Sequence, residues 1–185
     1  MKRAAIFLDR DGTLMEEVDY CDDPSRVRLL PGVAEALRQW KAAGYYLVLA
    51  TNQSGIGRGY FTLEAYHAVH RELVRQLEEA GAPPLDAAYF CPDAPPTTSP
   101  RRKPAPGMLL EAADDLGIDL SASWMIGDKG SDVECGRRAG TRTVLVETGY
   151  GEAAGVQADY RAADLKEAAR VIAQNPAIDK APPSA

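Results

Sequence analysis

Two aspartates, Asp9 and Asp11, directly follow the short apolar run 4–8 and precede Gly12 and Thr13. Carboxylates two residues apart repel one another and favour a cation between them, and oxygen ligands favour a hard ion such as Mg²⁺. One carboxylate can attack phosphorus to form an acyl phosphate, while the other protonates the leaving oxygen and then activates water. Gly12 would let the chain turn sharply away. The pattern indicates magnesium-dependent phosphoryl transfer, although an ordinary Asp-Gly surface turn has the same residues.

The segment 51–55, Thr-Asn-Gln-Ser-Gly, offers a hydroxyl and successive backbone N–H groups, which can bind phosphate oxygens at the end of a strand. The same residues are ordinary loop formers, so this segment alone is ambiguous. The glycines at 55, 57 and 59 do not match the dinucleotide pattern GxGxxG, and they come after the second expected strand instead of the first. We therefore expect no nucleotide cofactor there.

Two further charged groups are candidates for the same site. The run Arg101-Arg102-Lys103 could be a solvated charge cluster. Alternatively, its lysine ammonium would neutralise a transferring phosphoryl group, and an arginine fork would bind a second anion on the substrate. Asp128 directly follows an apolar segment and could complete a magnesium site. Asp132 either belongs to that site or only caps the next helix.

Hydrophobic periodicity predicts the elements that would position these groups. We expect buried strands at 4–8, 45–50, 87–90, 123–126 and 142–146. We expect helices at 33–43, 62–80, 107–116, 132–139 and 165–173. This alternation predicts an α/β fold with a doubly wound, mostly parallel, Rossmann-like sheet and helices on both faces. Ligands bind beyond the carboxyl ends of such strands, so the candidate groups should gather at one edge.

Length and composition indicate one ordinary globular domain. The 185 residues are 45% hydrophobic and 26% charged, close to typical values. We expect residues 1–174 to form a single domain, and 175–185, which carry three prolines, to form a mobile C-terminal tail. The net charge of −6 repels polyanions, so nucleic acid and anionic membranes are not expected partners.

The cysteines Cys21, Cys91 and Cys135 are widely spaced and form no CxxC pair. We interpret them as free thiols in a reducing cytosol. The N-terminus lacks the long apolar stretch and cleavage site of a signal peptide, and no segment approaches the ~20 apolar residues that span a bilayer. The sequence therefore predicts a cytoplasmic protein, which we expect to be a monomer.

Taken in order, these motifs match the four motifs of the haloacid dehalogenase superfamily: Asp9-x-Asp11-Gly12-Thr13, Thr51, Lys103 and Gly127-Asp128-x-x-x-Asp132. The finer stretches FLDRDGT, ATNQSGIGRG, YFCP, RKPAPGM and MIGDK resemble the D-glycero-D-manno-heptose 1,7-bisphosphate phosphatases and are similar to the related histidinol-phosphate phosphatases. Those families lack a large cap domain, and this chain has no room for one. The resemblance covers nearly the whole chain and implies a capless, magnesium-dependent phosphoric monoester hydrolase.

The resemblance also implies a role at each matching position. Asp9 would be the nucleophile and a magnesium ligand. Asp11, which phosphatases of this superfamily have and the related ion pumps lack, would be the general acid/base and offer magnesium its backbone carbonyl. Thr51 and Lys103 would hold the phosphoryl group, and Asp128 would bind magnesium. The implied substrate-binding residues are Glu17, Val18, Asp19, Tyr20, Asn52, Gln53, Ser54, Arg102 and Lys129.

One region departs from the resemblance. The heptose phosphatases usually carry a structural zinc loop that starts with a CPHHP-like sequence and continues to a CxC before the arginine. This chain has Cys91-Pro92-Asp93 and no further cysteine before Arg102, while His67 and His70 fall on an expected helix away from that loop. Since zinc needs about four nitrogen or sulfur ligands, we predict no zinc site and a packing role for both histidines.

Three substrates and one non-enzymatic function remain open at this stage. A heptose 1,7-bisphosphate, cleaved at its 7-phosphate, would need a cation such as Arg102 for its second phosphate. Histidinol phosphate carries a cation and would favour Glu17 or Asp19. A nucleic-acid 3′-phosphatase conflicts with the net charge, and a non-catalytic phosphate-binding protein would not need the complete catalytic set. The closer motif match favours the sugar bisphosphate, whereas the anomer and the pathway stay undetermined.

Overall fold

The computed structural model describes residues 2–150 and 155–176. Within them, the strands form one sheet in which every neighbouring pair is parallel, in the order β3-β2-β1-β4-β5-β6. The strands are β1 (Ala5–Leu8), β2 (Tyr46–Asn52), β3 (Ala87–Cys91), β4 (Trp124–Gly127), β5 (Arg142–Val146) and β6 (Tyr160–Ala162). The prediction of a doubly wound, parallel α/β sheet is confirmed.

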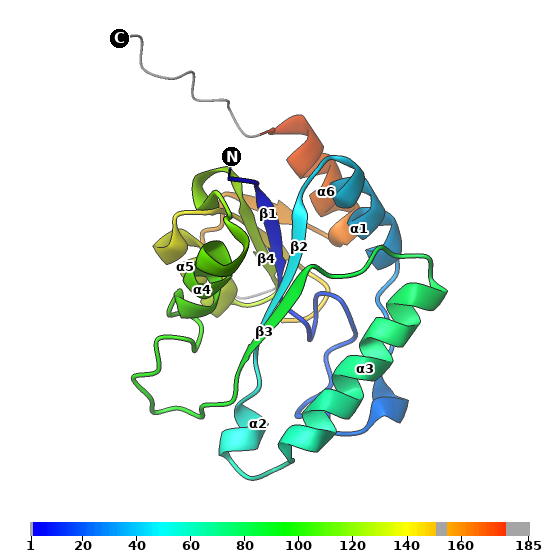
Figure 1. Cartoon of the computed structure of the whole chain (residues 1–185), viewed down its shortest axis with the longest axis vertical. Coiled ribbons are helices and arrows are strands. Elements are labelled where there is room, and N and C mark those ends of the chain that lie inside the picture. The colour runs from blue at the N-terminus through cyan, green and yellow to red at the C-terminus, as the bar shows by residue number, and fades with distance from the viewer. Residues whose placement is uncertain (1, 151–154, 177–185) are drawn as a thin grey trace.

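Helices cover both faces of this sheet. Figure 1 shows α4 and α5 on one side of the central strands and α1 and α6 on the other, with the long α3 below α1 on that second side. The helices are α1 (Val33–Ala42), α2 (Ser54–Gly57), α3 (Leu63–Glu79), α4 (Gly107–Leu116), α5 (Gly130–Ala139) and α6 (Leu165–Gln174), with short 3₁₀ turns η1 (Pro24–Arg26) and η2 (Leu120–Ala122). Thr62 caps α3, since its hydroxyl accepts a hydrogen bond from the Ala65 N–H at 3.2 Å.

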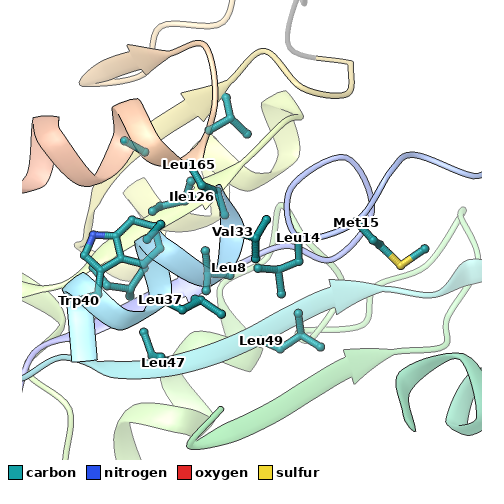
Figure 2. Packing of buried hydrophobic residues seen from close by; sticks show 14 of the residues in the cluster. Leu8, Leu14, Met15, Val33, Leu37, Trp40, Leu47, Leu49, Ile126 and Leu165 are labelled. Carbon is teal, nitrogen blue, oxygen red and sulfur yellow. The ribbon is translucent and has the colours of Figure 1, made fainter. Parts of the chain in front are cut away.

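The two faces of the sheet carry separate hydrophobic cores because successive strand side chains point to opposite sides. Along β1, Ile6 and Leu8 enter the core beside α1 and α6, whereas Ala5 and Phe7 enter the core beneath α4 and α5. Figure 2 shows the first of these, the α1-side core. Its labelled members are Leu8, Leu14, Met15, Val33, Leu37, Trp40, Leu47, Leu49, Ile126 and Leu165. Each buried side chain of this size contributes roughly 1.5–3 kcal/mol of burial free energy.

The structure differs from the expected elements in a few places. Strand β6 was not predicted because it is short and has Arg161 at its centre, so it lacks an apolar run; the ladder to β5 makes it a strand. Helix α2 lies in the glycine-rich segment expected to be a loop. A helix over 62–80 with its first apolar residue buried would place Leu63 in the core, but Leu63 is exposed and Val69 is buried in α3.

The segment between β1 and α1 is held against α3 and reaches the carboxyl edge of the sheet. The Gln76 side chain on α3 donates to the Val27 carbonyl at 3.0 Å and accepts from the Leu29 N–H at 3.3 Å. These hydrogen bonds fix a segment whose residues 17–21 line the pocket described below. Among the described residues, no helix is long and apolar enough to cross a bilayer.

The C-terminal boundary is anchored at its first residue. Asn175, the start of the predicted tail, accepts a hydrogen bond from Tyr160 Oη at 2.9 Å and one from Arg142 Nη1 to its carbonyl at 2.6 Å. The remainder of the predicted tail, from 177 onward, lies outside the described residues.

Candidate active site

The candidate residues meet where the strand order reverses, at the carboxyl ends of β1 and β4. These strands are neighbours in the sheet, with Leu8 opposite Ile126. Asp9 follows β1 and Asp128 follows β4, so both carboxylates emerge at the same point. An open parallel sheet binds ligands at this switch point, because loops from adjacent strands diverge there.

Asp9 forms a buried ion pair with Lys103. Lys103 Nζ lies 2.9 Å from Asp9 Oδ1 and 2.6 Å from Asp132 Oδ1, and it donates to the Ala50 carbonyl at 2.7 Å. Burial opposes ionisation of Asp9, but the charge and hydrogen bond of Lys103 outweigh it, so the pKa of Asp9 lies below its usual value. The same carboxylates raise the pKa of Lys103 despite its burial. Asp9 therefore stays ionised, as a nucleophile requires.

Asp132 has both of the functions that the sequence left open. One carboxylate oxygen pairs with Lys103, and the other accepts the Lys129 backbone N–H at 3.0 Å, which satisfies a free donor at the start of α5. Burial, with the nearby negative charge of Asp9, raises the pKa of Asp132, although the charge of Lys103 opposes the shift. Asp132 is a positioning group for Lys103 as well as a helix cap.

Asp128 is suited to bind a cation. Its Oδ2 accepts the Tyr150 backbone N–H at 2.8 Å, while its Oδ1 is buried without a hydrogen-bond partner among the described residues. Burial, with the nearby charge of Asp9, raises the pKa of Asp128 to about 6. One oxygen from each of Asp9, Asp128 and Asp132 falls within 4.8 Å of the others. A buried, unpartnered carboxylate oxygen in such a cluster fits a hard divalent ion.

The charge balance at the site supports the same conclusion. Among the described residues, five acidic and three basic side chains lie at the site, a formal excess of two negative charges that a divalent cation would neutralise. The acidic residues are Asp9, Asp11, Glu17, Asp128 and Asp132, and the basic residues are Arg10, Lys103 and Lys129.

Asp11 lines a pocket, and its carboxylate accepts hydrogen bonds from Arg10 and Gln53. Arg10 donates to it through Nε (3.1 and 3.2 Å) and Nη2 (3.0 Å). Gln53 Nε2 donates to Asp11 Oδ2 at 3.0 Å and also to Thr51 Oγ1 at 3.0 Å. Thr51 is buried near the end of β2, and Gln53 connects its hydroxyl to the Asp11 carboxylate.

The pocket in front of Asp11 has a volume of about 180 Å³. Its lining includes most of the predicted substrate-binding residues. These are Glu17, Val18, Asp19, Tyr20, Asn52, Gln53, Ser54 and Lys129, joined by Cys21, Gly55, Phe61 and Tyr150.

Lys129 spans one wall of this pocket. Its Nζ lies 3.0 Å from Glu17 Oε2 and 4.8 Å from the centre of the Tyr150 ring. Burial opposes its charge, but the carboxylates of Asp9, Asp128 and Glu17 outweigh burial and raise the pKa of Lys129. Glu17 therefore neutralises part of the positive charge of Lys129 at the pocket wall.

Two predicted binding residues have other contacts. The Asn52 side-chain amide donates to the backbone carbonyl of Lys103 at 2.9 Å and accepts from its backbone N–H at 3.0 Å. Asn52 therefore holds the loop that carries Lys103 in place. Arg102 donates to the Asp93 carbonyl at 2.8 Å and lines a separate hollow beside Pro95 and Arg138. In this structure the Arg102 side chain is not part of the pocket wall.

The loop after β5 contains candidate site residues that the sequence analysis missed. Besides the Tyr150 N–H on Asp128, Thr148 Oγ1 donates to the Gly12 carbonyl at 2.6 Å. An added Cβ at Gly149 would come within 2.2 Å of Asp128 Oδ2. The available signal was a Thr-Gly-Tyr segment at a strand end, on the edge where the other polar groups gather.

A family model described as HAD-hydrolase-like matches residues 100–170. D-glycero-D-manno-heptose-1,7-bisphosphate 7-phosphatase of Thermosynechococcus vestitus is 42% identical over 191 residues, covering 93% of this chain and 96% of that relative. D-glycero-β-D-manno-heptose-1,7-bisphosphate 7-phosphatase of Yersinia pestis is 42% identical over 177 residues, covering 89% and 94%. The chain belongs to the heptose-bisphosphate phosphatase family of the haloacid dehalogenase superfamily.

A solved structure of a family member supports the fold and the metal. The D,D-heptose 1,7-bisphosphate phosphatase of B. bronchiseptica, complexed with magnesium and phosphate, superposes with a TM-score of 0.84 at 32% identity, covering 93% of this chain and 98% of that one. The superfamily resemblance and the capless α/β fold are confirmed, and the chain is a phosphatase.

The region of the family's zinc loop has a local arrangement of its own in this chain. Cys91 is buried, and its Sγ lies 3.5 Å from Asp93 Oδ2 and 3.7 Å from Ser99 Oγ. On α3, the centre of the His67 ring lies 6.1 Å from that of Phe90, the β3 residue that precedes Cys91. His70 stacks on Tyr66 at 6.1 Å, consistent with packing, and burial lowers its pKa.

Proposed function

We propose that this phosphatase hydrolyses the 7-phosphate of D-glycero-D-manno-heptose 1,7-bisphosphate through an aspartyl phosphate on Asp9. The observation that carries the chemistry is the buried, ionised Asp9 carboxylate beside Lys103 and Asp128, at the switch point of the sheet. The names of the relatives that cover nearly the whole chain support the choice of substrate.

The proposed reaction has two steps. Asp9 attacks phosphorus, and a bond from its oxygen forms as the bond to the sugar oxygen breaks. Lys103 neutralises charge on the transferring group, and Thr51 holds one of its oxygens. Asp11 gives a proton to the departing alkoxide and then takes one from the water that cleaves the aspartyl phosphate, which returns both carboxylates to their starting states.

Asp9, Asp128 and the backbone carbonyl of Asp11 would hold Mg²⁺. When bound, the ion supplies positive charge that offsets the negative charge of the phosphate oxygens. The unpartnered Asp128 Oδ1 and the excess negative charge of the cluster support this assignment.

Further parts of the proposal concern the protein around the site. We propose that 1–174 fold as one domain, that the enzyme acts as a monomer in the cytoplasm, and that it needs no zinc. The free, buried cysteines Cys21, Cys91 and Cys135 support a reducing compartment. Nucleic acid and membranes are not proposed as partners, since the net charge is −6.

Histidinol phosphate is the second candidate substrate, and the pocket wall favours it. Glu17 and Asp19 line the pocket and could bind its cationic end, whereas Arg102, the expected partner of a second phosphate, lies outside. Lys129 is the basic residue among the described lining residues, and it is paired with Glu17.

The deciding experiment measures kcat/KM with magnesium for both anomers of the heptose bisphosphate and for histidinol phosphate, using one zinc-free preparation. The proposal expects one heptose anomer to exceed histidinol phosphate by on the order of 100-fold or more. The reverse preference would assign the substrate to the second candidate. No turnover of any ester by folded, magnesium-loaded protein would support the non-catalytic phosphate-binding alternative.

A further inference from the structure

Arg10, between the two catalytic aspartates, is almost completely buried, with 1% of its surface exposed. Its guanidinium packs 5.8 Å from the centre of the Tyr66 ring, and its Nη1 is buried without a hydrogen-bond partner among the described residues. Removing a guanidinium from water costs free energy, and the contacts that the buried cation makes must offset this cost. Those contacts are with Asp11 and Gln53.

The three side chains form a closed ring of hydrogen bonds. Arg10 donates to both Asp11 oxygens, and its Nη2 also donates to Gln53 Oε1 at 3.1 Å. Gln53 Nε2 then donates to Asp11 Oδ2 at 3.0 Å. An amide has one acceptor end and one donor end, and here each end has a matching partner. The Asp11 carboxylate is thereby fixed from two sides, by its chain neighbour and by a residue 42 positions away.

The ring leaves Asp11 usable. Its side chain remains 12% exposed and lines the pocket, while that of Arg10 is 1% exposed and does not line it. Arg10 therefore touches Asp11 but not the pocket, and it acts on the substrate only through that carboxylate. Thr51 Oγ1 also accepts from Gln53, so the ring is connected to the group that holds the phosphoryl oxygen.

We propose that Arg10, together with Gln53, is a positioning residue that fixes the orientation of the Asp11 carboxylate for proton transfer to the leaving group. This inference rests on the proposed role of Asp11. A planar guanidinium suits the task because it donates from two nitrogens in fixed directions, so the carboxylate cannot rotate without losing bonds. Lysine, with one point of attachment, would allow that rotation.

The test compares two leaving groups. An alkyl phosphate needs protonation of its leaving oxygen, whereas p-nitrophenolate departs without it because p-nitrophenol is a far stronger acid. In Arg10→Met we expect kcat/KM for the sugar phosphate to fall about 30- to 100-fold, and that for p-nitrophenyl phosphate less than about 3-fold. Arg10→Lys should lie between Arg10→Met and the unchanged enzyme.

Asn52→Ala is the matched control. Asn52 adjoins Gln53 but braces the Lys103 loop, which acts on the phosphoryl group of every ester. It should therefore slow both substrates to a similar degree. If Arg10→Met does not fold, as judged by circular dichroism, then Gln53→Met removes the other half of the ring and should show the same selective loss, at about 10-fold.

Equal losses on both esters, or no loss on either, in the folded Arg10 or Gln53 variant would overturn the inference. Asp11→Asn separates this failure from failure of the proposed function. If Asp11→Asn keeps turnover of the sugar phosphate, the proposed role of Asp11 is wrong. If Asp11→Asn loses it selectively while Arg10→Met and Gln53→Met do not, only the positioning role is wrong.

Discussion

Asp9 combines burial with an ionised carboxylate because Lys103 lies 2.9 Å away and is itself held by Asp132 and the Ala50 carbonyl. Lys103 would therefore keep two of its three partners without Asp9. We therefore expect that the Asp9 carboxylate, the proposed nucleophile, can be removed while the buried Lys103 ammonium keeps Asp132 as a charged partner.

Asp9→Asn should lower turnover by at least ~1,000-fold while leaving the unfolding temperature close to that of the unchanged protein. The amide cannot attack phosphorus, whereas Lys103 keeps Asp132 as a partner. Steady-state kinetics and a thermal melt provide the two measurements. Full activity in the variant would contradict the covalent mechanism.

The metal site should depend on pH through Asp128. Its pKa is 3.8 in an unperturbed chain and about 6 in the fold without metal. The folded state therefore binds the Asp128 proton more tightly than the unfolded chain does. The stability that this proton contributes is present below about pH 4 and is lost as the pH rises through 6. Mg²⁺ binds the ionised form, so magnesium should stabilise the protein more at pH 7.5 than at pH 5.

The measurement is the rise in melting temperature on adding magnesium at those two pH values, with Asp128→Asn as the control. At pH 7.5 without metal, this variant should be more stable than the unchanged protein by about 1 kcal/mol, since the disfavoured charge is gone and solvent screens part of its cost. It should also lose most of the magnesium effect. An equal effect of magnesium at both pH values would argue against Asp128 as a ligand.

At the scale of elements, the turn after β1 and the loop after β5 pack directly on Asp128. Gly12 has φ +75°, and a Cβ there would come within 2.4 Å of Asp128 Oδ2. The Thr148 hydroxyl bonds the Gly12 carbonyl, and Tyr150 donates its N–H to Asp128. The absence of a side chain at Gly12 therefore leaves room for the Asp128 carboxylate, the proposed metal ligand, and also permits the turn.

Gly12→Ala should weaken magnesium binding at least ~10-fold and also destabilise the fold by roughly 1–2 kcal/mol from the strained backbone. Gly117→Ala is a matched control, because Gly117 has φ +66° at the end of α4 but nothing within 4 Å of an added Cβ. It should show the loss of stability alone. Metal titration and urea unfolding distinguish the two effects, and equal magnesium affinity in both variants would exclude the steric argument.

At the scale of the whole molecule, two cores share one sheet. Trp40 and Trp124 belong to the α1-side core, whereas Cys91 and Cys135 belong to the core under α4 and α5. Every central strand contributes side chains to both, because alternate residues face opposite sides. The two cores should therefore unfold together, as the single-domain proposal requires.

Urea unfolding of a Cys21→Ala variant should give the same midpoint by tryptophan fluorescence and by thiol labelling. The substitution removes the cysteine of the α1-side core, so the remaining thiols, Cys91 and Cys135, both report on the opposite face. Separate midpoints would show that the faces unfold independently, against a single cooperative domain.

The sequence by itself determined the parallel sheet, the approximate positions of its longer strands and the gathering of Asp9, Thr51 and Asp128 at one edge. These features follow from local patterns: buried parallel strands are continuous apolar runs, and the residue after a strand must emerge at the edge. It did not determine β6, whose short polar segment becomes a strand only by pairing with β5.

Only the tertiary structure decided how the site is braced. The ring that joins Arg10 and Asp11 to Gln53, the double role of Asp132 and the Tyr150 N–H on Asp128 all link positions on different loops. The position of Arg102 outside the pocket is of the same kind. Such contacts depend on where folded loops meet and on which side-chain rotamers fit there, and neither is encoded in the periodicity of any one segment.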